Sequence, residues 1–299
     1  MSCSESHLSY EEQLNKFIGR GMFVKNKTKA LERLKHISYY KIKQFSTFFM
    51  DNSGNYKQNT SFEAVIQNFY FDKNLRMEFL KCSEKIELSI KNKIAYLLGV
   101  KYGAFGYLNF SSWCDRSRPK QEIQNEELKF KKKIQKKMKL FSDNSIIKDF
   151  VINNLTETYL SIWRLSEVLT FGEALYLFEM MSQKNKVSIA RNYNLKVDEF
   201  TSYVNNIKLV RNLCAHNMSI IHLKLRTIPK MNTDFSNILN RYDRIFSSIL
   251  IIIYFIKNIN PNYKFKTLYH TVCQLIKRNK VAKIYGIKNY KLLKKYIKS

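Results

Sequence analysis

Residues 61–99 limit the folds that this chain can adopt. Their apolar side chains recur three and four positions apart, which is the spacing of one face of an α-helix. Ser61 is suited to cap the first turn of such a helix, and Gly99 is suited to end it. We therefore expect one or two long helices in the core. Their apolar positions are Phe62, Val65, Ile66, Phe69, Leu75, Phe79, Ile86, Leu88, Ile90, Ile94 and Leu97.

Turn-forming residues are scarce, with 8 glycines and 3 prolines in 299 residues. A many-stranded β-sandwich or barrel needs more of them, so the composition disfavours an all-β fold. Short helices are predicted at residues 10–17 and 27–36, a loop at 52–59, and further helical segments at 145–178, 198–216 and 245–256. The predicted fold class is mostly α: a multi-helix bundle with accessory N-terminal helices and a basic C-terminal extension.

The chain divides into four parts by composition. The clearest break is the glycine-containing stretch 102–113 followed by a polar stretch, 114–125, that contains Pro119. We expect a helical N-terminal part at residues 1–115 and a basic linker or helix at 116–142. A second helical part follows at 143–260, and the basic extension occupies 261–299.

The charge of the chain is strongly positive, because 52 Lys and Arg face 24 Asp and Glu and give a formal net charge of +28. Residues 244–299 contain no acidic residue, and residues 129–139 place apolar residues at helical spacing among lysines. Lysines that meet phosphates release condensed counterions, so RNA is the predicted partner. An anionic membrane surface remains an alternative, as does a merely solvated helix face for 129–139. The candidate RNA-binding residues are Lys131, Lys132, Lys133, Lys136, Lys137, Lys277, Arg278, Lys280 and Lys283.

Several classes of protein lack support in the sequence. The five cysteines form no C-x-x-C pair, and the P-loop, zinc-protease and nucleophile-elbow motifs do not occur. The first residues are polar and acidic where a signal peptide is basic and apolar. The apolar run 245–256 is shorter than the ~20 residues of a membrane-spanning helix. We expect a cytoplasmic protein with no membrane insertion, no metal and no cofactor.

The hexapeptide RNLCAH, residues 211–216, carries the most specific chemistry in the chain. Cleaving RNA through its own 2′-hydroxyl needs a base, an acid and a cation at the phosphate. His216 can serve as base or acid near neutral pH, and the Arg211 guanidinium can bind two phosphate oxygens. The candidate catalytic residues are therefore Arg211, Asn212 and His216, and no metal is required.

The spacing of these residues predicts how they must be arranged. Asn212 and His216 share a helix face, whereas Arg211 and His216 diverge by about 140° on an ideal helix. Either the arginine bends round or the helix ends near His216. One copy offers a single such histidine, so a twofold dimer that apposes the two helices is predicted. The alternative is structural: a histidine packed in the core or capping a helix, and an arginine in a surface ion pair.

The hexapeptide is one of several blocks in a fixed order. LERLKHISYYKIKQF (31–45), SFEAVIQNFYFDKNLR (61–76) and YGAFGYLN (102–109) lie in the first half of the chain. WRLSEVLTFGEALYLFEMM (163–181), IARNYNL (189–195) and VRNLCAH (210–216) follow. Together they resemble the Abi family of bacterial abortive-infection proteins, of the AbiD and AbiF type, over about residues 20–225.

This resemblance implies a HEPN-like helical fold, in which an R-N-x-x-x-H motif forms a metal-independent RNA-cleaving site at a dimer interface. It also implies antiphage defence and kinship with the paired nuclease domains of type VI CRISPR effectors. By position the motif falls on Arg211, Asn212 and His216. Asn217 stands where many relatives carry a second histidine.

The function predicted is that of a cytoplasmic, homodimeric endoribonuclease that binds RNA in an abortive-infection or toxin–antitoxin system. A different class also fits the sequence: a non-catalytic RNA-binding protein in a stable complex with a structured noncoding RNA. A third possibility is a toxin that acts at a membrane surface through its basic amphipathic segments.

Overall fold

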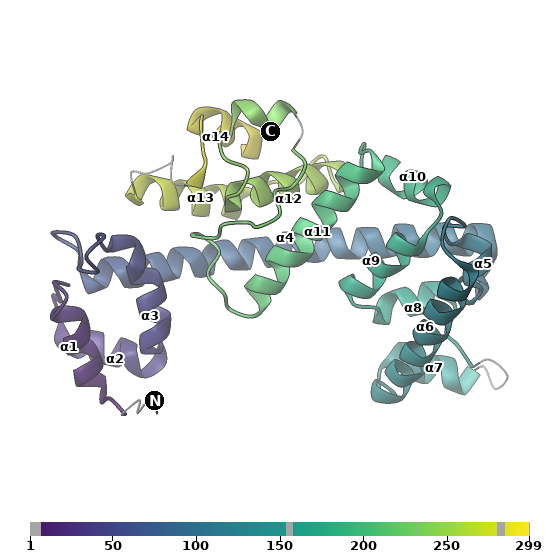
Figure 1. Ribbon diagram of the computed structural model, residues 1–299, viewed down its shortest axis with the longest axis horizontal. Coiled ribbons are helices and arrows are strands. Elements are labelled where there is room, and N and C mark those ends of the chain that lie inside the picture. Colours follow the sequence, from purple (N-terminus) through teal and green to yellow (C-terminus); the bar gives the residue numbers. More distant parts are fainter. Residues whose placement is uncertain (1–6, 154–157, 232, 280–284, 299) are drawn as a thin grey trace.

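The computed structural model describes residues 7–153, 158–231, 233–279 and 285–298, and its elements are helices joined by turns and loops (Figure 1). The structure is 69% helical. Within these ranges the only β-type pairings are isolated bridges, and no strand forms. The predicted mostly α, multi-helix fold is confirmed.

A single long helix, α4 (Phe62–Tyr102), spans the molecule and contacts most of the other helices (Figure 1). It has 41 residues and is therefore about 60 Å long. The Ser61 side chain accepts a hydrogen bond from the Ala64 N–H at 3.1 Å, which confirms the predicted cap. Of the one or two helices expected here, the structure forms one.

The predicted stop at Gly99 is wrong. The helix continues for one more turn and ends at Gly103, whose φ of 79° is readily adopted only without a side chain. Gly99 has a packing role instead, because a Cβ atom there would lie 3.4 Å from Ile162 Cγ2 and 3.6 Å from the Trp163 ring. The glycine lets α8 (Ile162–Val168) approach α4 closely.

The N-terminal helices lie at the end of the molecule where α4 begins (Figure 1). They are α1 (Tyr10–Ile18), α2 (Lys27–His36), α3 (Tyr39–Ser46) and the short 3-10 helix η1 (Thr47–Phe49). The first two match the short helices predicted at 10–17 and 27–36. The loop predicted at 52–59 is confirmed as a series of turns.

The helices after α4 form the opposite end of the molecule (Figure 1). The segment expected to be helical at 145–178 is divided into three helices, and the last of them, α9, begins with a capping box formed by Thr170 and Glu173. Besides α8, the elements are η2 (Gly106–Leu108), α5 (Phe110–Trp113), α6 (Lys120–Leu140), α7 (Ser145–Asn153), α9 (Phe171–Met180) and α10 (Gln183–Arg191).

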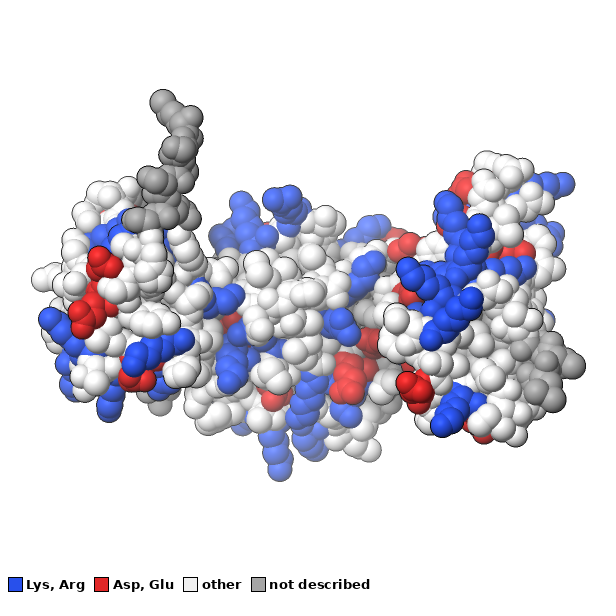
Figure 2. All heavy atoms as spheres, turned by 90° about the horizontal axis from the view of Figure 1, so that it is seen from below, with Lys and Arg blue, Asp and Glu red and all other residues white. Residues whose placement is uncertain are grey.

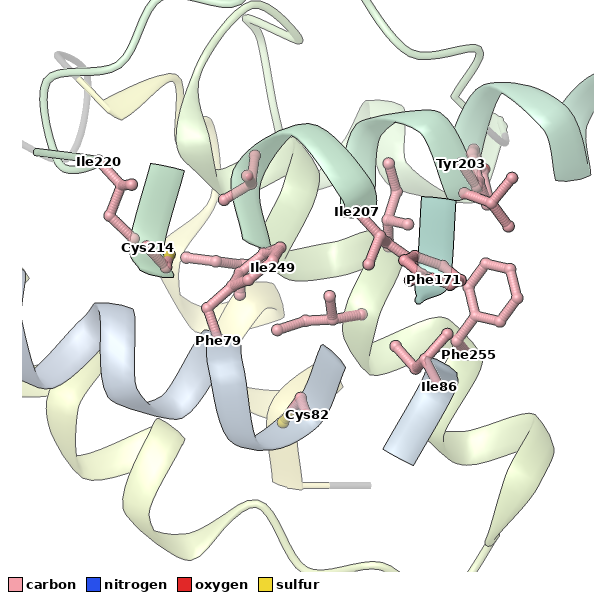
Figure 3. Packing of buried hydrophobic residues seen from close by; sticks show 14 of the residues in the cluster. Phe79, Cys82, Ile86, Phe171, Tyr203, Ile207, Cys214, Ile220, Ile249 and Phe255 are labelled. Carbon is pink, nitrogen blue, oxygen red and sulfur yellow. The ribbon is translucent and has the colours of Figure 1, made fainter. Parts of the chain in front are cut away.

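The remaining helices lie along the middle of α4. These are α11 (Val197–Ala215), η3 (Thr233–Asn237), α12 (Ile245–Ile259), α13 (Lys266–Asn279) and α14 (Tyr290–Lys298). Three of them, α11 to α13, pack directly against α4. Figure 3 shows the packing between them, with Phe79 of α4 and Cys214 of α11 among the interlocked side chains. The apolar run at 245–256 is the buried helix α12, as predicted, and within the described residues no helix is long and apolar enough to cross a bilayer.

Candidate functional site

Helix α11 ends at the predicted motif. His216 is the C-cap residue, and Asn217 takes the left-handed conformation with φ 57°. The Asn217 N–H donates to the Cys214 carbonyl at 3.1 Å. The Met218 N–H donates to the Leu213 carbonyl at 2.8 Å. These two bonds form a Schellman motif, so the helix ends at His216, which is one of the two arrangements that the spacing allowed.

The three motif side chains lie at the surface. Asn212 and His216 are exposed on one face of α11, so the alternative that packs His216 in the core is wrong. Arg211 is 40% exposed and bends toward its neighbour, with Nη1 donating to Asn212 Oδ1 at 3.3 Å. Its Nη2 lies 3.8 Å from Glu87 Oε2 on α4, which is the surface ion pair that the structural alternative expected for Arg211. This ion pair is long and half-exposed, so it holds the guanidinium only weakly.

A buried charged network holds the loop that follows the motif. Asp72 of α4 is fully buried and accepts hydrogen bonds from the backbone N–H groups of Ile220 and Ile221 at 2.7 and 2.9 Å. It also pairs with Arg76, whose Nε lies 2.8 Å away. Arg76 in turn donates to Asn217 Oδ1 at 2.8 Å. Each charge is therefore paired and hydrogen-bonded, as burial requires.

Asn217 is held from a second side as well. The Lys41 ammonium of α3 donates to the Asn217 carbonyl at 2.6 Å. Asparagine tolerates the left-handed conformation better than most residues. Asn217 therefore has a structural role here, because it positions the end of α11.

The sequence reasoning missed Asp72 and Arg76. Both lie in the apolar stretch that predicts α4, and they are four residues apart on one helix face. The available signal was a pair of opposite charges at positions where the pattern of α4 otherwise has core residues, since such charges must be paired when they are buried. Their partners lie more than 140 residues further along the chain, so the pattern alone could not name them.

The surface beside the motif is partly apolar. A hollow of about 550 Å³ lies between α4 and Arg211, and Met77, Lys81, Glu87 and Leu88 are among its lining residues. Met77 and Leu88 are each more than half exposed. On α11 and its loop, two further apolar side chains near the motif are 44% exposed, Leu209 and Met218. Such a surface is typical of a contact between proteins.

The lysines predicted on residues 129–139 lie on α6, which is basic and amphipathic as expected. Lys131 pairs with Glu127, and Lys133 pairs with Glu173 at 3.3 Å. Lys137 is only 11% exposed and donates to Glu173 at 2.7 Å and to the Val168 carbonyl at 2.9 Å. The remaining two, Lys132 and Lys136, are exposed.

Glu173 illustrates how this part of α6 is neutralised. Burial would raise the pKa of the Glu173 carboxyl, but the hydrogen bonds from Lys137 and Thr170 outweigh that effect, and the pKa is lowered. Figure 2 shows blue Lys and Arg side chains gathered at the end of the molecule that carries α6, with red acidic ones beside them. Lys132 and Lys136 are therefore the cations of this group that remain open to an external anion.

The candidate residues near the C-terminus are only partly described. Lys277 and Arg278 lie on α13, but their side chains are outside the description. Lys280 and Lys283 lie outside the described residues. Among the described residues, no three or more His, Cys, Asp or Glu side chains cluster in a way that could hold a metal ion.

The fold and the site define a mostly helical protein with an exposed Arg-Asn-His site at a helix end. The chain belongs to the Abi-like protein family, which matches residues 32–222 and so covers well over half of the sequence. The matched region contains α4, the motif and the buried network. No curated protein and no solved structure matches the chain. Membership of this family points to a role in abortive infection.

Proposed function

We propose that this protein is an RNA-binding, metal-independent endoribonuclease of a bacterial abortive-infection or toxin–antitoxin system, with a HEPN-like bundle and a cytoplasmic site of action. The observation that carries the proposal is the arrangement at the end of α11. Asn212 and His216 are exposed on one face, and Arg211 bends to within hydrogen-bond distance of Asn212. Family membership supports the defence role.

The proposed reaction uses the 2′-hydroxyl of the RNA as nucleophile. A base takes the proton of that hydroxyl, the 2′-oxygen bonds to phosphorus, and the bond to the 5′-oxygen breaks. An acid then protonates the 5′-oxygen, which leaves a 2′,3′-cyclic phosphate and a new 5′-hydroxyl end. His216 serves as the base or the acid, Arg211 stabilises the negative charge on the phosphorus centre, and Asn212 orients one of them.

The second proton-transfer group comes from a second copy of the chain. A twofold dimer across α11 places two sets of the motif around one cleft. The exposed apolar side chains near the motif support this arrangement, since Leu209 lies on the same face of α11 as Asn212. We expect Leu209→Asp to shift the protein from dimer to monomer in light scattering. Leu128→Asp, at a similarly exposed leucine on α6, should leave the dimer intact.

The direct test is cleavage of cellular RNA by purified protein. We expect His216→Ala to lower the rate at least 100-fold, because general acid–base catalysis contributes about 10²–10⁴-fold. His36→Ala is the matched control, since His36 is also an exposed helical histidine but lies on α2. EDTA should not slow the reaction. Equal cleavage by the wild-type protein and His216→Ala would contradict the proposal.

A second candidate function is binding without cleavage, in a stable complex with a structured noncoding RNA. The exposed cations Lys132 and Lys136 on α6 favour it, because no described carboxylate neutralises them and they remain open to the phosphates of an RNA. Under this alternative the purified protein carries nucleic acid, seen as a high 260/280 absorbance ratio, and cuts no RNA. Arg211→Ala then weakens RNA binding and lowers its salt dependence.

A further inference from the structure

A groove runs between the C-terminal half of α4 and helix α10, away from the motif. Two adjoining hollows of about 720 and 270 Å³ form it, and the larger lies within the range of ligand pockets, about 300–1,000 Å³. One wall carries Lys93, Tyr96 and Lys101 from α4. The other carries Lys184 and Arg191 from α10, which are seven residues apart and so lie on one face.

The groove is lined by cations and by no carboxylate. Lys93, Lys101, Lys184 and Arg191 all line it, and none of them forms an ion pair with a described carboxylate. This differs from α6, where Glu127 and Glu173 neutralise three of the five candidate lysines. A row of unpaired cations creates a positive potential that attracts polyanions.

Lys101 is held in place by a buried partner. Its ammonium donates to Asn185 Oδ1 at 2.9 Å, and Asn185 is only 1% exposed. The amide of Asn185 donates in turn to the Tyr102 hydroxyl at 3.0 Å and to the Trp113 carbonyl at 3.3 Å. The lysine therefore has a fixed direction where the two hollows meet, which lowers the entropy lost when it binds a ligand.

Tyr96 gives the groove an aromatic surface. Its side chain is 70% exposed, although a tyrosine ring is usually at least half covered by its own protein. Exposed aromatic rings among cations are the combination by which proteins bind single-stranded nucleic acid, since bases stack on the ring while lysines and arginines contact the phosphates. Bases in a duplex are already stacked on one another and cannot use such a ring.

The groove is separate from the motif. Lys93, Tyr96 and Val100 lie about 120–180° around α4 from Glu87, the residue that faces Arg211. We propose that this groove, which lies further along α4 than the motif, is a binding site for single-stranded RNA. The proposal rests on the proposed function only in taking RNA as the ligand, because binding here needs neither cleavage nor His216.

The test measures binding of a fluorescent single-stranded RNA of about 12 nucleotides, a length within the site size of such grooves. All variants carry His216→Ala so that the probe is not cut. We expect Tyr96→Ala to weaken binding about 5- to 150-fold, the loss of one stacked base. Lys101→Glu with Arg191→Glu should lower the slope of log K against log salt by about 1.4, which corresponds to two phosphate contacts.

The matched control reverses two charges elsewhere. Lys16→Glu with Lys57→Glu changes the net charge equally, at two exposed lysines of the N-terminal end. This control should change binding by no more than about two-fold at physiological salt, because distant charges are screened. A blunt RNA duplex of the same length should bind more weakly than the single strand. Tighter binding of the duplex, or binding only to phosphatidylserine vesicles, would overturn the proposal.

The outcomes separate this proposal from the proposed function. If the groove variants bind the probe as the parent protein does while the wild-type chain cuts RNA, the groove is not an RNA site and the endoribonuclease stands. If they lose binding while the wild-type chain cuts nothing, the groove stands without the endoribonuclease. Tyr96→Ala is an exposed substitution, and circular dichroism checks that the fold is kept.

Discussion

His216 and His222 are six residues apart in one loop but lie in opposite environments. His216 is exposed at the end of α11. His222 is mostly buried and stacks on Phe48, with ring centroids 4.7 Å apart. The side of the loop that faces α4 is fixed by paired charges, whereas the side that faces solvent carries lightly held polar groups. The site is therefore held firmly on the side that packs against α4 and is accessible on the side that faces solvent. This arrangement suits the positioning of an external substrate.

The largest effect on stability is expected at Asp72. Asp72→Ala leaves the buried guanidinium of Arg76 without its partner and removes the acceptor of two backbone N–H groups. Breaking a buried ion pair from one side costs about 3–5 kcal/mol. Urea denaturation measures the loss. A stability equal to that of the wild-type protein would mean that the network does not hold the loop.

The second effect is a pH dependence that comes from His222. Burial is the main cause that lowers the pKa of His222 to about 4; Asp72 opposes the shift, and Arg244 adds a smaller lowering to it. The unfolded chain binds a proton near pH 6.5 and the folded chain does not, so stability is fully present above pH 6.5 and is lost as the pH falls toward 4. The expected contribution is about 3 kcal/mol.

The variant His222→Phe separates this contribution from other titrating groups. Phenylalanine keeps the stacking on Phe48 but binds no proton. Between pH 7 and pH 4 the variant should lose about 3 kcal/mol less stability than the wild-type protein. Denaturation curves at a series of pH values measure the difference. Parallel curves for the two proteins would show that His222 titrates normally.

A smaller effect is expected at Asn217. Asn217→Ala removes the hydrogen bond from Arg76 and places alanine at a φ of 57°, for a combined loss of about 2 kcal/mol. Asn217→Gly loses the same hydrogen bond but adopts this backbone conformation freely. Thermal melting should therefore rank the glycine variant above the alanine variant. The reverse order would contradict the structural role of this residue.

The smallest effect on stability is expected at His216, on the solvent-facing side of the loop. His216→Ala should change the free energy of unfolding by less than about 0.5 kcal/mol, since exposed substitutions remove few contacts. Paired with the cleavage assay, this measurement shows whether the histidine acts in chemistry or in folding. A large loss of stability would show that His216 contributes to folding, as the residues on the α4-facing side of the loop do.

Local patterns predicted much of this fold. Apolar spacing predicted α4 and the buried helix α12. The angle between Arg211 and His216 predicted that either the arginine bends round or the helix ends near the histidine, and the structure has both features. Contacts between distant segments were not predictable in the same way. The pairing of Asp72 with the loop at 220–221 and that of Lys137 with Glu173 depend on how helices pack, and no single stretch of sequence encodes that.

Gly99 also shows that a local sequence pattern does not predict contacts between distant segments. A glycine near the end of a helical pattern usually marks its end. Here it marks the place where a second helix approaches, and Gly103 ends the helix. The groove between α4 and α10 was missed for a related reason, since its cations come from two segments whose relative register only the folded chain defines.

Because α4 is one continuous helix, the number of residues between the motif and the groove sets how the two are oriented relative to each other. One inserted residue between Glu87 and Lys93 would rotate everything beyond it by about 100° and translate it by about 1.5 Å. The groove would then face in a different direction relative to the motif, although every side chain would still be present. We expect natural relatives to keep the length of this segment unchanged.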